Sequence, residues 1–274
     1  MYSKFEIVVD DDFFNDEIKR YSNYGNDIFS ECQNDAKEIL NKYILKNGTL
    51  DGDAMAEEWF AMQEADVFIS HSHKDIDKVK TFAGWLYETF GLDCFIDSCV
   101  WGYADELLKI IDDKYCKNAN SNSYNYNQRN YSTSHVHMML SVALCKMMYK
   151  TECIMFYNTP NSISVVDDLE SIKDMQKRDR VTISPWIYQE LALSSFIEPQ
   201  IPQRLQKQLI QLMEHSGEQN HVELDIQHDV SGYLTKMHRL GRNELRWWKN
   251  AYCIGNDKYS LDVLYQKYSN GSMG

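Results

Sequence analysis

Three short runs of consecutive apolar residues constrain the fold of this chain more than any other feature. They are Val67-Phe68-Ile69, Cys94-Phe95-Ile96 and Ile154-Met155-Phe156. Continuous apolar runs of this length are typical of strands covered on both faces, as in a parallel sheet. We therefore expect these segments to be strands of one central, mostly parallel sheet.

Amphipathic helical patterns lie between and after these strand candidates. From Ile76 to Phe90, apolar residues recur at spacings of three and four, and Gly91 follows where a helix would end. A second helix is indicated by Leu107, Leu108 and Ile111, and a third by the apolar positions from Val136 to Met147. The alternation of strand and helix predicts an α/β fold with a doubly wound sheet.

The remaining segments are interpreted as additions to one domain that spans residues 65–250. Residues 1–64 are polar, carry apolar residues at helical spacing, and are expected to form an N-terminal helical extension. The Asn- and Ser-rich stretch 117–134 and the charged stretch near 161–183 are expected to be loop insertions. Residues 251–274 are expected to form a C-terminal tail.

Three further elements are expected in the second half of the domain. Pro185 to Phe196 is a predicted helix, with proline at the first position, where a missing N–H does no harm. Val222, Leu224 and Ile226 alternate with polar residues and favour a strand with one wetter face. The tryptophan-rich segment from Val230 to Lys249 is expected to be helical.

The composition limits the partners and the compartment. The formal net charge is -13, and a surface of this sign repels phosphate backbones, so no nucleic-acid partner is expected. No apolar run approaches the roughly 20 residues that span a bilayer, and the acidic start lacks the positive region of a signal peptide. The seven cysteines form no C-x-x-C pair, so neither a disulfide framework nor a thiolate zinc site is indicated. We expect a cytoplasmic protein without a membrane partner.

Polar residues follow the first strand candidate where α/β domains bind ligands. The segment Ser70-His71-Ser72-His73-Lys74-Asp75 comes directly after the first apolar run. Ligands of open α/β sheets bind at the carboxyl ends of the strands. Ser70 and His71 are therefore candidates for ligand contacts, whereas Ser72 with Asp75 fits a helix-capping pattern.

Two segments together resemble TIR domains, and among them the bacterial TIR-like proteins of antiphage systems such as Thoeris. The first runs from Ala65 to Asp75, and the second is Ser184-Pro185-Trp186-Ile187-Tyr188-Gln189-Glu190-Leu191. The second is similar to the family's helix that carries a catalytic glutamate, and the order of elements between the two agrees. The resemblance covers roughly residues 60–250 and implies a flavodoxin-like fold.

The resemblance also implies a function. TIR enzymes of this kind cleave the nicotinamide–ribose bond of NAD, so NAD is the expected substrate and no separate cofactor is expected. The product would be ADP-ribose or a cyclic or ADP-ribose-derived signal that a downstream effector senses. Self-association through TIR contacts and a phage-derived trigger are the other expected interactions.

Glu190 is the residue to which the resemblance assigns catalysis. Bond cleavage builds positive charge on the ribose, and a nearby carboxylate can stabilise that charge. Trp186 lies one turn earlier, so the two would share a helix face and the indole would form an apolar wall of the substrate site. The alternative interpretation is that Glu190 is a solvated helix residue.

The loop that begins at Asp97 borders the NAD site in the family and mediates contacts between TIR domains. By this resemblance, Trp101 or Tyr103 would stack on a base or on the nicotinamide ring. The alternative is that they cover the edge of the core. Asp97 would either contact the ligand or cap the helix that follows.

Two other functions are weighed against an NAD-cleaving enzyme. His71-x-His73-x-Asp75 is similar to the H-x-H-x-D-H zinc motif of metallo-β-lactamase-type hydrolases, but Ile76 stands where the last histidine is required. No metal site is therefore predicted. The second is a non-catalytic TIR adaptor that acts by protein assembly, and the presence of Glu190 beside Trp186 disfavours it.

Overall fold

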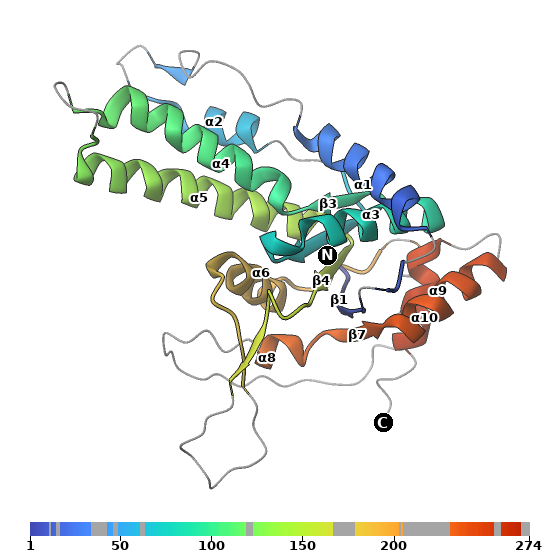
Figure 1. Ribbon diagram of the computed structural model, residues 1–274. Helices are drawn as coiled ribbons and strands as arrows, with labels where there is room; N and C mark the ends of the chain where they lie inside the picture. Colours follow the sequence, from blue (N-terminus) through green and yellow to red (C-terminus); the bar gives the residue numbers. More distant parts are fainter. Residues whose placement is uncertain are drawn as a thin grey trace, which may run out of the picture.

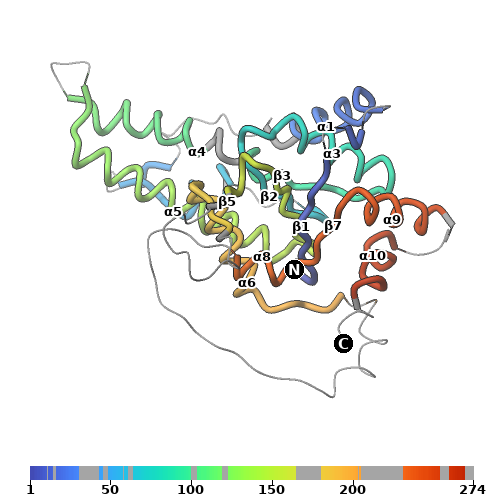
Figure 2. The backbone as a smooth tube through the Cα atoms, turned by 60° about the horizontal axis from the view of Figure 1, so that its bottom comes forward, coloured from blue at the N-terminus to red at the C-terminus, as the bar shows by residue number. Residues whose placement is uncertain are grey.

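The computed structural model describes residues 1–10, 12–14, 17–33, 43–45, 49–60, 64–118, 123–166, 179–202, 204, 231–254 and 259–269. Within these residues, five parallel strands form a central sheet between two layers of helices (Figure 1 and Figure 2). In spatial order the strands are β3 (Cys94–Ile96), β2 (Val67–His71), β4 (Cys153–Tyr157), β1 (Ser3–Val8) and β7 (His238–Gly241). The predicted α/β fold with a mostly parallel sheet is confirmed, and the three apolar runs are strands.

The strand order is flavodoxin-like. Such sheets have the order 2-1-3-4-5, and the same order results here when β2, β3 and β4 are counted as the first three strands. The N-terminal strand β1 then takes the fourth place and β7 the fifth. The path of the chain across the sheet reverses between β2 and β4, which makes their carboxyl ends the topological switch point.

The prediction that residues 1–64 form a helical extension is wrong for β1, which lies in the middle of the sheet. Two polar residues, Lys4 and Glu6, concealed the strand pattern. Both find partners far along the chain: the Lys4 amine donates to the Ser194 carbonyl at 2.8 Å, and the Glu6 carboxylate accepts from Arg180. Partners at such separations cannot be identified from a local pattern.

Helices cover both faces of the sheet. One face packs against α1 (Ile18–Gln33), α3 (Ile76–Phe90), α9 (Arg242–Ile254) and α10 (Ser260–Ser269). The other packs against α2 (Gly52–Trp59), α4 (Ser98–Ile111), α5 (Tyr126–Lys150), α6 (Pro185–Phe196) and α8 (Ser231–Leu234). Helices α2, α4 and α5 project beyond the sheet as a helical arm (Figure 1). Among the helices that the structure describes, none combines the length and the apolar character needed to cross a membrane.

Both predicted loop insertions contain regular structure. In the stretch 117–134, helix α5 already begins at Tyr126, and the Asn125 side chain accepts a capping hydrogen bond from the Gln128 N–H at 3.1 Å. In the stretch 161–183, β5 (Ser164–Val166) and β6 (Asp179–Val181) pair as an antiparallel hairpin. Two short helical turns complete the described structure, the 3-10 turn η2 (His73–Asp75) and the π-helix η3 (Asp112–Cys116).

The C-terminal expectations need correction. The segment from Val230 to Lys249 contains β7 as well as helix, and the tail 251–274 contains α10, whose apolar residues belong to the core. The helix from Pro185 to Phe196 is confirmed as α6. The strand expected over 222–226 and part of the predicted helical extension, residues 34–42, lie outside the described residues.

Substitution of Ile7 by alanine tests whether β1 is part of the core. The Ile7 side chain is fully buried, whereas Ile18 at the start of α1 is 43% exposed. We expect Ile7→Ala to lower the free energy of unfolding by about 2–5 kcal/mol, and Ile18→Ala to change it by less than about 0.5 kcal/mol. Urea denaturation of both variants measures the difference, and equal effects would contradict the placement of β1.

Substitution of Ser184 by alanine tests the start of α6. The Ser184 hydroxyl oxygen accepts the Ile187 N–H at 3.3 Å as the helix N-cap. We expect Ser184→Ala to cost about 1 kcal/mol of stability, measured by thermal melting. Ser184→Thr keeps the capping oxygen and serves as the control. If Ser184→Thr loses as much stability as Ser184→Ala, the capping hydrogen bond is unimportant.

Candidate functional site

Four residues predicted from the sequence converge at the carboxyl edge of the sheet. Ser70 and His71 end β2, Asp97 follows β3, and Glu190 lies on α6. Because Ile69 pairs with Ile96 in neighbouring parallel strands, Ser70 and Asp97 emerge side by side at the edge. All four side chains belong to residues that are at most 1% exposed. This buried cluster lies beside the topological switch point, where open α/β sheets bind ligands.

The Glu190 carboxyl group is anchored by Ser70. The Ser70 hydroxyl donates to Glu190 Oε2 at 2.5 Å in a fully buried hydrogen bond. The other oxygen, Oε1, is also buried and receives no N–H or O–H hydrogen bond within the described residues. A buried carboxyl oxygen without a donor favours the protonated form of the group, since protonation removes the charge.

Asp97 occupies the N-cap of α4 and receives several hydrogen bonds. Its Oδ1 accepts the Ser98 N–H at 2.7 Å, and its Oδ2 accepts the His71 N–H at 3.4 Å. His71 Nδ1 lies 2.5 Å from Asp97 Oδ1, with both side chains fully buried. The capping role that the sequence left open for Asp97 is therefore confirmed. N–H donors and the helix N-terminus both favour the ionised form of this carboxyl group.

Burial shifts the protonation of the whole cluster. Burial raises the pKa of Asp97 to about 8, although hydrogen bonds from Glu190 and from backbone N–H groups oppose the shift. Burial also raises the pKa of Glu190 well above its usual range, and the adjacent charge of Asp97 adds to the effect. Burial lowers the pKa of His71 to about 4, so the imidazole is neutral at pH 7. The two carboxyl groups therefore bind and release protons as a pair, and in the hydrogen bond between them Glu190 is the donor and Asp97 the acceptor.

A second hydrogen-bond network ties the loop after β2 to the loop after β4. The buried Asp75 carboxylate accepts from Thr159 Oγ1 at 2.5 Å and from Asn161 Nδ2 at 2.8 Å. These two partners were missed in the sequence analysis. They lie two and four residues after the end of the buried strand β4, so the rule that selected Ser70 and His71 would have found them if it had been extended into this loop.

Several expected roles are not found. Ser72 is the N-cap residue of η2, but its side chain makes no capping hydrogen bond, because a 3-10 turn intervenes before α3 begins at Ile76. Glu190 is not a solvated helix residue, since it is only 1% exposed. Trp186 packs edge-on against His137 of α5, with ring centroids 5.5 Å apart, and is partly buried against the apolar cluster between the sheet and helices α2, α4 and α5.

The aromatic residues expected in a loop after β3 lie in a helix. Trp101 and Tyr103 are part of α4, which begins directly after Asp97. Their side chains lie outside what the structure describes, so stacking on a ligand ring stays a prediction.

The residues of the zinc motif do not converge. His71 contacts Asp97, His73 is exposed, and Asp75 is engaged by the loop after β4. Within the residues that the structure describes, no group of three or more His, Cys, Asp or Glu side chains has the arrangement of a metal site. The structure therefore gives no support to the metal-dependent hydrolase.

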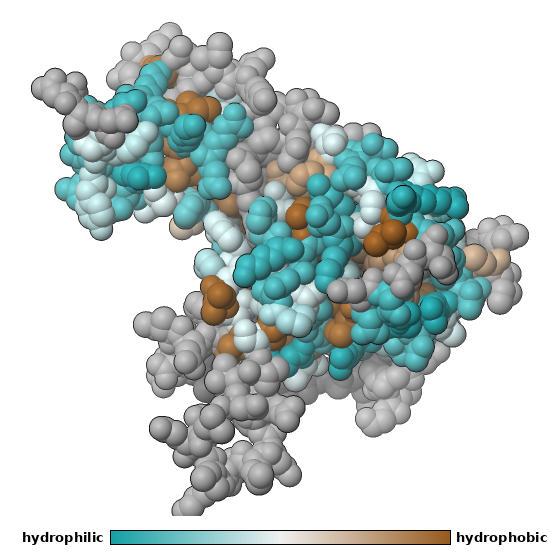
Figure 3. Space-filling view, in the orientation of Figure 1, coloured by the Kyte–Doolittle hydropathy of each residue, from teal (hydrophilic) through white to brown (hydrophobic). Residues whose placement is uncertain are grey.

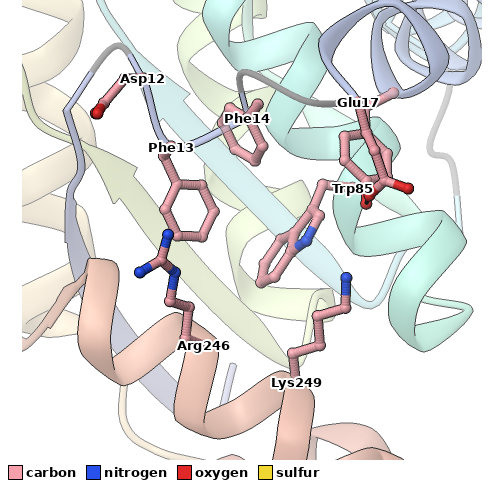
Figure 4. A pocket seen from close by; sticks show the side chains of 8 residues that line it. Asp12, Phe13, Phe14, Glu17, Trp85, Arg246 and Lys249 are labelled. Atoms are coloured by element: carbon pink, nitrogen blue, oxygen red, sulfur yellow. Dashed lines mark hydrogen bonds between the residues drawn. The ribbon is translucent and has the colours of Figure 1, made fainter.

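Two cavities of the described structure lie away from the buried cluster. One of about 840 Å³ is in the helical arm, and one of about 180 Å³ lies between Phe13, Trp85 and the α9 side chains Arg246 and Lys249 (Figure 4). Neither is lined by Ser70, His71, Asp97 or Glu190. Because Ser70, His71, Asp97 and Glu190 are each at most 1% exposed, a substrate can reach the Glu190 carboxyl group only after a local rearrangement.

The buried carboxyl pair predicts a pH dependence of stability. A carboxyl group whose pKa is raised in the folded state stabilises the fold at low pH, and this contribution is lost as the pH rises through the folded pKa. The lowered pKa of His71 has the opposite effect, but only below about pH 6.5. Stability should therefore fall between pH 6.5 and about 8, by up to about 1.4 kcal/mol per pH unit for each proton released on unfolding.

Denaturation across this pH range, with matched variants, measures the effect. Glu190→Gln should flatten the decline, because the amide cannot ionise. Glu198→Gln, at an exposed position just beyond α6, should keep the decline of the parent protein. Identical slopes for all three proteins would mean that the buried carboxyl pair does not control stability.

Comparison of the chain with protein-family models, with curated proteins and with solved structures finds no match. The functional proposal therefore rests on the geometry of the buried cluster and on the sequence resemblance.

Proposed function

We propose that this protein cleaves the nicotinamide–ribose bond of NAD, with Glu190 as the catalytic carboxylate. The observation that carries the proposal is the meeting of Glu190 with Ser70 and Asp97 at the switch point of the sheet. Residues from three separate elements bring a titratable carboxyl group to the edge where this fold class binds ligands. Strongly perturbed carboxyl groups concentrate at such functional sites.

The proposed reaction needs one anionic group and little acid catalysis. The C1′–N bond breaks, and its electron pair leaves with nicotinamide, which is thereby converted from a cation to a neutral molecule. The ribose becomes an oxocarbenium-like cation, which Glu190 stabilises. Addition of water with loss of a proton gives ADP-ribose, and attack by a nucleophile of the ADP-ribose itself gives a cyclic product.

The charge of the substrate can also prepare the carboxylate. Glu190 holds a proton in the closed cluster because its ionised form is buried beside Asp97. A cationic nicotinamide ring beside the pair favours the ionised form and so promotes loss of that proton. On this account the closed cluster is a resting state, and an activating event must open it to admit NAD.

The proposal includes the biological setting that the resemblance implies. NAD is the substrate and no separate cofactor is needed. The protein acts in the cytoplasm in antiphage defence, self-associates through TIR-type contacts and responds to a phage-derived trigger, and its product is sensed by a downstream effector. The expected contacts at Trp101 and Tyr103 belong to this part of the proposal.

A non-catalytic adaptor that acts by protein assembly is the second candidate function. The complete burial of Glu190 favours it, since a Ser–Glu–Asp–His network can also serve to hold α6 on the sheet. Exposed apolar side chains along α5 offer a surface for assembly: Tyr131, Met138, Val142 and Tyr149. Release of nicotinamide from NAD distinguishes the enzyme from the adaptor.

Glu190→Gln tests the catalytic assignment. The amide can accept the Ser70 hydroxyl and donate to Asp97, so the fold should persist, but it cannot supply the negative charge. We expect nicotinamide release to fall by about 100- to 1,000-fold, with Glu198→Gln retaining the parent rate. A Glu190→Gln protein that is folded and turns over NAD at the parent rate would show that Glu190 is not catalytic.

A further inference from the structure

A large cleft in the helical arm is separate from the site proposed for NAD. Its volume is about 840 Å³, and it lies between the start of α2, the π-helix η3 and the first half of α5. The arm projects from the sheet in Figure 1, and Figure 3 shows hydrophobic residues at its surface. Volumes of about 300–1,000 Å³ are typical of small-molecule sites.

The lining of the cleft is mostly apolar, and the described residues that form it include no carboxylate, ammonium or guanidinium group. Leu50, Met55, Ile111 and Met139 supply aliphatic and thioether surface. Polar but uncharged groups are supplied by the amides of Asn127 and Gln128 and by hydroxyl-bearing residues. A charged ligand would lose part of its hydration against this lining without a carboxylate, ammonium or guanidinium partner from the described residues, which costs free energy. The lining therefore selects against phosphates, and so against NAD itself.

One wall of the cleft is fixed by a partly buried ion pair and by hydrogen bonds. The Asp112 carboxylate at the start of η3 accepts the Ser132 hydroxyl at 2.5 Å and the Arg129 Nε–H at 3.0 Å. These contacts join the π-helix to α5, and neither Asp112 nor Arg129 is among the described residues that line the cleft. π-Helical segments occur frequently at functional sites, and a fixed wall lowers the entropic cost of binding.

An aromatic pair lies on the α5 side of the cleft. The Tyr131 and His135 rings meet edge-on, with centroids 4.4 Å apart, and both residues line the cleft. Such rings offer a flat surface for a planar ligand. The other end of α4, where Asp97 lies, is about 20 Å away along a helix of this length, so the cleft and the buried cluster are separate sites.

We propose that this cleft binds an uncharged, largely apolar small molecule with a planar ring. The ligand contacts Met139 and Tyr131 on α5 and the aliphatic residues that face them from α2 and α4. The site does not depend on the proposed NAD chemistry, because it shares no lining residue with the buried cluster.

Binding of N-phenyl-1-naphthylamine, an uncharged fluorescent probe, tests the proposal on the full chain. We expect one saturable site, with binding at least about tenfold tighter than that of 1-anilinonaphthalene-8-sulfonate, a sulfonated probe of similar shape. Absence of saturable binding of the uncharged probe would overturn the site, and equal affinity for the sulfonated probe would overturn the ligand class.

Two neighbouring methionines provide matched variants. Met139 lines the cleft, whereas Met138 is 64% exposed and does not. Met139→Trp should fill the cleft and weaken binding at least about tenfold, and Met138→Trp should leave binding unchanged. Tyr131→Ala, at a 70% exposed position, should also weaken binding with little risk to the fold. Circular dichroism establishes whether each variant is folded. If both folded cleft variants bind the probe as the parent protein does, or if Met138→Trp weakens binding as much as Met139→Trp, the probe binds elsewhere and the proposal is wrong.

Discussion

The hydrogen bond from the Ser70 hydroxyl to the Glu190 carboxyl group joins α6 to the end of β2, 120 residues earlier in the chain. Both groups are excluded from water, so solvent cannot replace this bond if it is lost. Glu190 stays buried only while it holds a proton or faces a positive charge. The position of α6, the hydrogen bond to Asp97 and the proposed reaction all depend on that requirement. In the proposed mechanism, the closed site becomes reactive when the cationic nicotinamide ring takes the place of the proton.

The fold could be predicted where local pattern and tertiary environment agree. Strands β2, β3 and β4 are apolar on both faces and therefore stand out from the sequence. Strand β1 is equally central, but Lys4 and Glu6 disguise it, because their partners Ser194 and Arg180 lie more than 170 residues away. Strand β7 begins with His238 and Arg239, both exposed, so it has no apolar run to reveal it.

The residues of the candidate site could be predicted from the sequence more readily than their burial and protonation. Strand-end rules selected Ser70, His71 and Asp97, and the resemblance selected Glu190; the structure brings these four together. Burial could not be predicted, because it depends on how α6 packs over the strand ends. The same limit applies to Trp186, whose ring packs toward α5 although Glu190 lies one turn away. Periodicity gives the face of a helix but not the neighbour that covers it.

The most direct measurement of the central claim is an NMR time course of NAD incubated with the purified full chain at high protein concentration. A long incubation makes slow turnover by a mostly closed site visible. The account predicts that nicotinamide and an ADP-ribose product appear together, with several turnovers per chain, and that Glu190→Gln protein releases no more than spontaneous hydrolysis does. If the parent protein releases no more nicotinamide than folded Glu190→Gln protein does, the assignment of Glu190 as the catalytic carboxylate is contradicted.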